Sequence, residues 1–210
     1  MLSATEIVDL HDQQTFAWHQ SPSGPQEPAS SGLQPADGWL ALVARQHRAN
    51  FDLWHIEDEA RAPGATEAEL ARVKHRVDST NQLRNDLAEE LDEVLLHWLG
   101  ARGLPNHEAA LHSESPGLII DRLSILALKI YHTREEAQRT DAPQGHAARN
   151  RQRLAILEEQ RADLAGCLDA LWSETLAGTR RFKLHRQLKM YNDPSLNPAV
   201  YRKLVNEETR

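Results

Sequence analysis

Four ionisable side chains interrupt an otherwise apolar segment at residues 118–132. The segment reads LIIDRLSILALKIYH, and a helix that is apolar on almost every side is normally buried. Stepping by about 100° per residue places Asp121, Arg122, Lys129 and His132 on one arc that is also about 100° wide. Because a buried charge is costly unless it is paired or neutralised, this arc predicts either a ligand site or salt bridges to neighbouring helices.

A second group of charges lies at the end of the segment 39–61. Asp58 projects into the middle of an apolar arc that contains Phe51 and Trp54, and Glu57 lies at the edge of that arc. The carboxylate of Asp58 is therefore either a buried ionic group or a side chain that emerges into solvent and pairs with Arg61 at i+3. Carboxylate oxygens suit hard divalent cations, so this end of the segment is a candidate cation site.

The stretch DSTNQLRND at residues 78–86 is unusually polar for the middle of a helix. Asp78 and Asn85 project away from the apolar face, whereas Arg84 projects onto it. A polar face of this kind is solvated when it stands alone. If another segment covers it, it becomes an oxygen-rich wall suited to Mg²⁺ or to ligand hydroxyls.

Residues 180–191 form a basic stretch in an acidic protein. The stretch contains no acid, and its basic residues are Arg180, Arg181, Lys183, His185, Arg186 and Lys189. Arginine offers forked donors that match phosphate, so the stretch could bind an anion. Docking onto the acidic face of the preceding 66–99 helix is an equally good interpretation.

Apolar periodicity and capping residues predict an all-α fold: a four-helix, antiparallel bundle with terminal additions. A capping box at Ser3–Glu6 predicts a short helix to about Leu10. We expect this helix and a flexible Ser/Pro/Gly-rich linker at 1–38, the bundle domain at 39–178, and a basic C-terminal extension at 179–210 that packs on the bundle. The four bundle helices are predicted at 39–61, 66–99, 118–138 and 145–176.

Composition limits the classes of partner. The chain has 210 residues, a formal net charge of −7 and a single cysteine, so it cannot form an intramolecular disulfide. The acidic balance disfavours nucleic acid and anionic lipid as partners. No apolar run approaches the roughly 20 residues of a membrane span, and the start of the chain lacks the features of a signal peptide. We therefore expect a cytoplasmic protein.

The eleven histidines are scattered without a Cys cluster, so no structural zinc site is predicted.

Four segments in order along the chain carry a family resemblance. The segments 50–61, 77–86, 121–132 and 180–194 resemble the bacterial domain-of-unknown-function family 4254, and the resemblance covers most of 40–201. That family implies no established activity. A fainter likeness is to the all-helical nucleoside triphosphate pyrophosphohydrolases, which bind Mg²⁺ through Glu-x-x-Glu and Glu-x-x-Asp helices. Glu89 and Asp92 resemble the second motif, but Ala60 stands where the first motif would end.

These patterns predict a site that binds a phosphorylated or otherwise anionic small molecule, such as a nucleotide, a sugar phosphate or a nucleotide sugar. Metal-dependent hydrolysis or group transfer would follow if Mg²⁺ or Mn²⁺ were held by Glu57, Asp58 and Asp86. His132 and Asp58 are the candidate catalytic residues, because the charge of histidine changes near neutral pH. The predicted ligand-binding residues are Asp78, Asn81, Arg84, Asn85, Asp121, Arg122, Lys129, Arg180, Arg181 and Lys189.

The alternative is a non-catalytic helical adaptor. Its polar motifs would form an internal ion-pair network that fixes the register of the bundle, and its basic extension would dock a partner. The sequence leaves the oligomeric state open between a monomer and a homo-oligomer. A ligand site should leave a pocket with converging charges, whereas a register network should pair every charge and leave no cavity.

Overall fold

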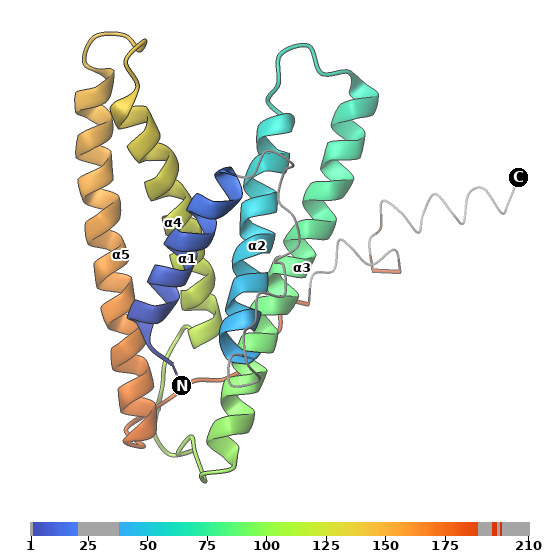
Figure 1. Ribbon diagram of the computed structural model, residues 1–210. Helices are drawn as coiled ribbons and strands as arrows, with labels where there is room; N and C mark the ends of the chain where they lie inside the picture. Colours follow the sequence, from blue (N-terminus) through green and yellow to red (C-terminus); the bar gives the residue numbers. More distant parts are fainter. Residues whose placement is uncertain (1, 21–37, 189–194, 197, 199–210) are drawn as a thin grey trace, which may run out of the picture.

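The computed structural model describes residues 2–20, 38–188, 195, 196 and 198. Within these residues the chain forms five helices and two very short strands (Figure 1), which confirms the all-α prediction. The helices are α1 (Ala4–His19), α2 (Gly38–Glu59), α3 (Glu67–Gly100), α4 (Pro116–Gln138) and α5 (His146–Leu176), and the strands are β1 (Ala110–Leu111) and β2 (Arg180–Arg181). None of the described helices is both long enough and apolar enough to cross a membrane.

The helices are arranged as two hairpins with α1 between them. The most extensive helix contacts are those of α2 with α3 and of α4 with α5, and α1 contacts α2, α4 and α5. The turns of both hairpins lie at the same end of the molecule, and the chain begins at the other end (Figure 1). One continuous core joins the elements, with Leu91 of α3, Ile120 of α4 and Leu168 of α5 fully buried in it.

Local signals set the helix starts. The Thr66 hydroxyl accepts from the backbone N–H of Glu69, whose carboxylate accepts in return from the Thr66 backbone, so a capping box opens α3. Pro116 occupies the first turn of α4, where its missing N–H leaves no hydrogen bond unmade. Gly145 precedes α5 with a φ of 81°, a left-handed conformation that glycine adopts without strain.

Helix α1 is longer than predicted and belongs to the core. Its Ser3 cap is as expected, since the Ser3 hydroxyl accepts from the Glu6 backbone, but the helix continues to His19 rather than ending near Leu10. Its buried residues include Ile7, His11 and Thr15, which recur every four positions on one face. Two of these three are polar, so apolar periodicity alone did not reveal the second half of the helix.

Helix α4 begins in very close contact with α3. The Asp92 carboxylate accepts a hydrogen bond of 2.7 Å from the backbone N–H of Gly117, a favourable place for an acid at a helix N-terminus. A Cβ on Gly117 would lie 2.2 Å from the carbonyl oxygen of Ala88, so only glycine fits. Burial raises the pKa of Asp92 to about 6, although the nearby Ser115 side chain and the hydrogen bond from the Gly117 backbone oppose that rise.

The described part of the basic extension packs back onto the bundle. Strand β2 pairs in parallel with β1, with Arg180 opposite Ala110. The side chain of Phe182 is buried in the core. Arg186 then forms ion pairs with Glu89 and Glu93 of α3 at 3.3 and 2.8 Å. Docking onto the acidic face of α3, one of the two interpretations of this stretch, is therefore observed for Arg186.

Candidate functional site

A buried polar network lies where α2, α3 and α4 meet. The Oδ1 atom of Asp121 accepts hydrogen bonds from the side-chain amides of Gln46 at 2.6 Å and Asn50 at 2.9 Å. Arg84 of α3 adds an ion pair, with its Nε atom 3.4 Å from the same oxygen. Burial raises the pKa of Asp121, while Arg84 and the two amides favour its charged form. This one carboxylate thus ties three helices together.

The network continues into α1 through a buried histidine. Nδ1 of His47 lies 2.7 Å from the Ser124 hydroxyl, and its Nε2 lies 2.9 Å from the Thr15 hydroxyl. Asn50 also donates to Ser124 at 3.0 Å. Burial lowers the pKa of His47 to about 3, so the imidazole is neutral at physiological pH. Because hydroxyls serve as both donors and acceptors, they satisfy either tautomer of this neutral ring.

A cleft of about 380 Å³ opens beside this network. Its charged wall includes Glu57, Asp58, Arg61 and Arg84, and Asn50 connects it to Asp121. The side chains of Leu53, Trp54, Ile125 and Leu128 form its apolar wall. The volume lies within the range of small-molecule sites, which combine an apolar lining with a few placed polar groups.

The charges of the cleft differ in how they are engaged. Glu57 pairs with Arg61 one turn later, with Oε2 and Nη2 3.2 Å apart, and Asp58 is exposed to solvent. Asp58 therefore does not form the predicted side-chain pair with Arg61 among the described contacts. The side chain of Arg84 is 24% exposed, and Asp121 is its ion-pair partner among the described residues. Arg61 is also held, through Glu57, but its side chain is 68% exposed, so Arg84 is the more buried of the two cations on this wall.

The predicted arc on α4 is divided among three environments. Asp121 lies in the buried network, whereas Arg122 and Lys129 line a separate groove of about 720 Å³ that also includes residues of α5. Arg122 pairs there with Glu114 at 2.7 Å. His132 contacts aromatic side chains of α1 and α2. Neighbouring helices pack on α4 from several sides, so side chains within one arc meet different partners.

Most of the polar stretch 78–86 lies outside the cleft. Asp78 pairs with Lys74, and Asp86 accepts a hydrogen bond of 2.7 Å from Gln82. Asn85 is buried and Asn81 is half-buried, yet Arg84 is the only residue of the stretch that lines the cleft described above. The structure thus brings together Glu57 and Asp58 but does not add Asp86 to them.

The remaining predicted residues make contacts elsewhere in the chain. Arg180 pairs with Glu174 at 2.9 Å, and Arg181 donates to the carbonyl oxygen of Ala109 at 2.8 Å. Neither lines the cleft, and Lys189 lies outside the described residues. Glu89 and Asp92, the pair that resembles a pyrophosphohydrolase motif, contact Arg186 and Gly117 respectively.

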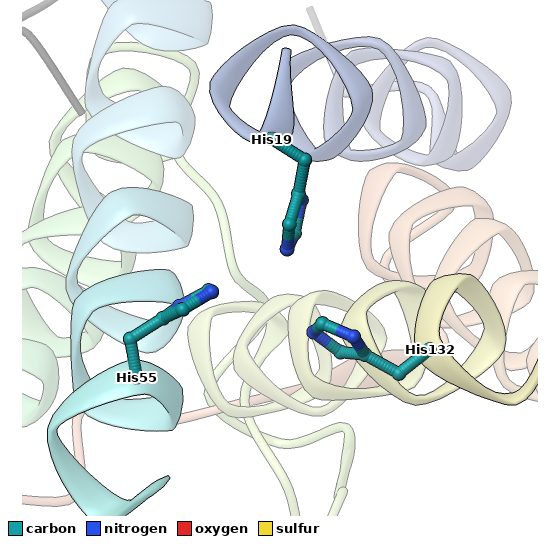
Figure 2. Close-up of side chains that lie close together, drawn as sticks. All are labelled: His19, His55 and His132. Atoms are coloured by element: carbon teal, nitrogen blue, oxygen red, sulfur yellow. The ribbon is translucent and has the colours of Figure 1, made fainter. Parts of the chain in front are cut away.

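Three histidines from distant parts of the sequence converge on one point (Figure 2). His19 ends α1, His55 lies on α2 and His132 lies on α4, and one ring nitrogen of each lies within 4.8 Å of those of the other two. No other group of three His, Cys, Asp or Glu side chains in the described ranges comes together in this way. Sequence reasoning singled out His132 but missed the other two, because no local spacing connects residues 19, 55 and 132.

The described structure is therefore an all-α protein with a buried polar network and a charged cleft between two helical hairpins. A family model described as "Protein of unknown function (DUF4254)" matches residues 40–184, and the chain belongs to this family. Helix α1, which supplies His19, lies before the matched region. Neither the curated proteins nor the solved structures contain a match to this chain.

Proposed function

We propose that the cleft between α2, α3 and α4 binds a small molecule that carries an anionic group and a flat or apolar portion. The position of Arg84 supports this proposal most strongly. Its guanidinium is half-buried at the wall of the cleft, and Asp121 engages it at Nε. Arginine presents several donors in a planar fork, so nitrogens other than Nε could receive a phosphate or carboxylate.

The apolar wall of the cleft favours a ligand with a planar or apolar part. Trp54 and three aliphatic side chains line that wall, and an indole ring offers a large, flat contact area. Nucleotides and nucleotide sugars combine a ring with phosphates and fit this division. Asn50 also lines the cleft, where its amide could orient a ligand hydroxyl.

A divalent cation would act here together with the ligand. Glu57 and Asp58 bring two carboxylates to the cleft, fewer than the oxygens that Mg²⁺ or Mn²⁺ needs. Mg²⁺ commonly binds one or two carboxylates together with substrate phosphates and water. We propose that metal binding at this cleft depends on the phosphorylated ligand, and that hydrolysis or transfer, if it occurs, uses Asp58.

A thermal-shift screen tests the binding proposal. The full chain is heated with nucleotides, sugar phosphates and nucleotide sugars, each with and without Mg²⁺ or Mn²⁺. A ligand present at 100 times its dissociation constant stabilises a fold by about 2.7 kcal/mol, which raises the melting temperature measurably.

Variants on α3 decide whether a shift comes from the cleft. Arg84→Gln should abolish the shift, whereas Arg72→Gln, an exposed arginine on the same helix, should leave it unchanged. A shift that survives in Arg84→Gln would contradict the proposal. The absence of a shift with every compound would instead favour the adaptor alternative.

A further inference from the structure

We propose that His19, His55 and His132 together bind one divalent transition-metal ion, with Zn²⁺ as the best chemical match. The three side chains come from α1, α2 and α4 and point toward a common centre (Figure 2). Imidazole is a preferred ligand of Zn²⁺, Cu²⁺ and Ni²⁺, whereas Mg²⁺ prefers oxygen. This site is distinct from the anion cleft and does not depend on it.

In each of the three rings, Nδ1 already has a partner that accepts a hydrogen bond. Nδ1 of His19 lies 2.7 Å from the carbonyl oxygen of Thr15, and Nδ1 of His55 lies 2.8 Å from that of Phe51. Nδ1 of His132 lies 3.1 Å from the carboxylate of Glu135. Carbonyl and carboxylate oxygens only accept hydrogen bonds, so each Nδ1 carries the proton and each Nε2 keeps its lone pair.

This arrangement is the one that metal-binding histidines use. Such residues almost always donate the N–H of the second ring nitrogen to a carbonyl or a carboxylate, which fixes the tautomer and the orientation of the ring. The free Nε2 atoms of His19 and His132 are buried and have no hydrogen-bond partner among the described residues. An unsatisfied buried polar atom costs roughly 1–3 kcal/mol, and a bound cation would remove that cost.

The size of the cluster requires only a small contraction. Ligand nitrogens at Zn–N distances of about 2.0–2.1 Å in a tetrahedron lie about 3.3 Å from one another, compared with up to 4.8 Å for the group here. The rings are held in an aromatic environment that limits their motion. Tyr131 stacks on His19 with ring centroids 4.2 Å apart, and Trp54 stacks on His132 at 4.9 Å.

Access to the cluster suggests a fourth ligand from solvent. A second cleft, of about 500 Å³, is lined by His19 and His55 together with Asp52 and other residues. Zinc sites with three protein ligands and one open position are typical of catalytic centres, whereas structural sites have four protein ligands. We infer that water or a small ligand would complete the coordination from this cleft, and that the ion would also fasten the end of α1 to α2 and α4.

Metal binding to the full chain tests the proposal directly. The protein is stripped with a chelator and titrated with Zn²⁺ by calorimetry, and Co²⁺ is added in parallel because its visible spectrum reports tetrahedral coordination. The expected result is one ion per chain, with a tetrahedral Co²⁺ spectrum and a higher melting temperature with Zn²⁺.

Matched variants assign the ion to this cluster. His19→Gln, His55→Gln and His132→Gln should each weaken Zn²⁺ binding by more than about 100-fold, since loss of an outer hydrogen-bond partner alone costs ~10–100-fold. His75→Gln, an exposed histidine on α3, should bind as the wild type does. A Zn²⁺ affinity that is equal in His19→Gln and His75→Gln overturns the proposal.

A fourth variant keeps the test decisive if a histidine variant fails to fold. Glu135 is exposed and its carboxylate holds Nδ1 of His132, so Glu135→Ala, which removes the acceptor, should fold normally and weaken Zn²⁺ binding by about 10-fold. An unchanged affinity in this variant would overturn the proposed coordination. Arg84→Gln should leave Zn²⁺ binding intact, which separates this proposal from that of the anion cleft.

Discussion

The indole ring of Trp54 stacks on the imidazole of His132, with ring centroids 4.9 Å apart and ring planes inclined by 10°. Trp54 also lines the cleft that contains Arg84, and His132 belongs to the histidine cluster. One side chain therefore contacts both candidate sites.

This contact predicts that Trp54 reports metal binding by fluorescence. Zn²⁺ bound at His132 would place a positive charge next to the indole ring, which changes its emission. We expect a saturable change in tryptophan emission on adding Zn²⁺ to the chelator-treated protein, and we expect most of that change to be lost in Trp54→Phe. The measurement is a fluorescence titration of both proteins.

A distant tryptophan provides the control for this titration. Trp98 contacts Trp172, with ring centroids 5.6 Å apart, and neither belongs to the histidine cluster. Trp98→Phe should therefore keep the Zn²⁺-dependent change. If Trp54→Phe and wild type respond equally, the ion does not bind beside Trp54.

The Asp121 network predicts a large loss of stability when its carboxylate is removed. Asp121→Ala would leave Arg84, Gln46 and Asn50 without their shared acceptor, and breaking a buried pair by removing one partner costs about 3–5 kcal/mol. Urea denaturation should show a loss of this size. Asp121→Asn, which retains an acceptor oxygen, should lose less, and equal losses in the two variants would show that the hydrogen bonds are not the cause.

Sequence reasoning recovered the helices of the bundle because local rules define them. The Thr66 capping box that opens α3 acts within a few residues, and Pro116, which begins α4, lies two residues before the start predicted at 118. Helix α1 was predicted too short because the face that packs in the core carries His11 and Thr15. Both side chains are buried next to His47. His11 stacks on the His47 ring with centroids 4.4 Å apart, and the Thr15 hydroxyl lies 2.9 Å from Nε2 of His47. Only the tertiary structure supplies these partners.

Helix positions also indicated some of the residues that line the cleft, because these positions follow from the sequence of a single helix. Asp58, Glu57 and Arg84 were singled out from their helix positions, and they do line one cleft. Projection could not show that Lys129 and His132 face different neighbours, because an arc of one helix does not say which helix covers it. The histidine cluster required the end of α1 to lie beside α2 and α4, which no local pattern encodes.

Because His47 is buried as a neutral imidazole, we expect the free energy of unfolding to fall on mild acidification. Its pKa is about 3 in the folded chain and 6.5 ordinarily, so its contribution is present above about pH 6.5 and is lost as the pH falls toward 3. This difference alone corresponds to a loss of about 2 kcal/mol between pH 7 and pH 5. Urea denaturation at the two pH values should show a smaller loss in His47→Gln, which cannot be protonated in this range.

Other groups with shifted pKa values also contribute to the pH dependence in that comparison, His11 and Asp92 among them. Burial also lowers the pKa of His11, so His11 adds to the acid-induced loss. Asp92 changes the stability in the opposite direction, because its pKa of about 6 in the folded chain lies above its ordinary value of 3.8. Its contribution to the free energy of unfolding is therefore lost as the pH rises through 6. Parallel pH profiles for wild type and His47→Gln would contradict the buried neutral imidazole.

The contact between α3 and α4 predicts opposite effects of the same substitution at two helical glycines. Gly117→Ala would place a methyl group 2.2 Å from the carbonyl oxygen of Ala88 and 3.0 Å from the Asp92 carboxylate, so α4 must move away from α3. Overpacking of this kind costs about 1–3 kcal/mol, and the displaced helix start would also lose the hydrogen bond from the Gly117 N–H to Asp92. Gly166→Ala on α5 has nothing within 4 Å of the added carbon, and alanine is favoured over glycine in a helix by about 0.8–1.0 kcal/mol. Chemical denaturation should therefore show Gly117→Ala to be less stable than the wild type and Gly166→Ala to be equally or more stable. A Gly117→Ala protein as stable as the wild type would mean that α3 and α4 do not approach this closely.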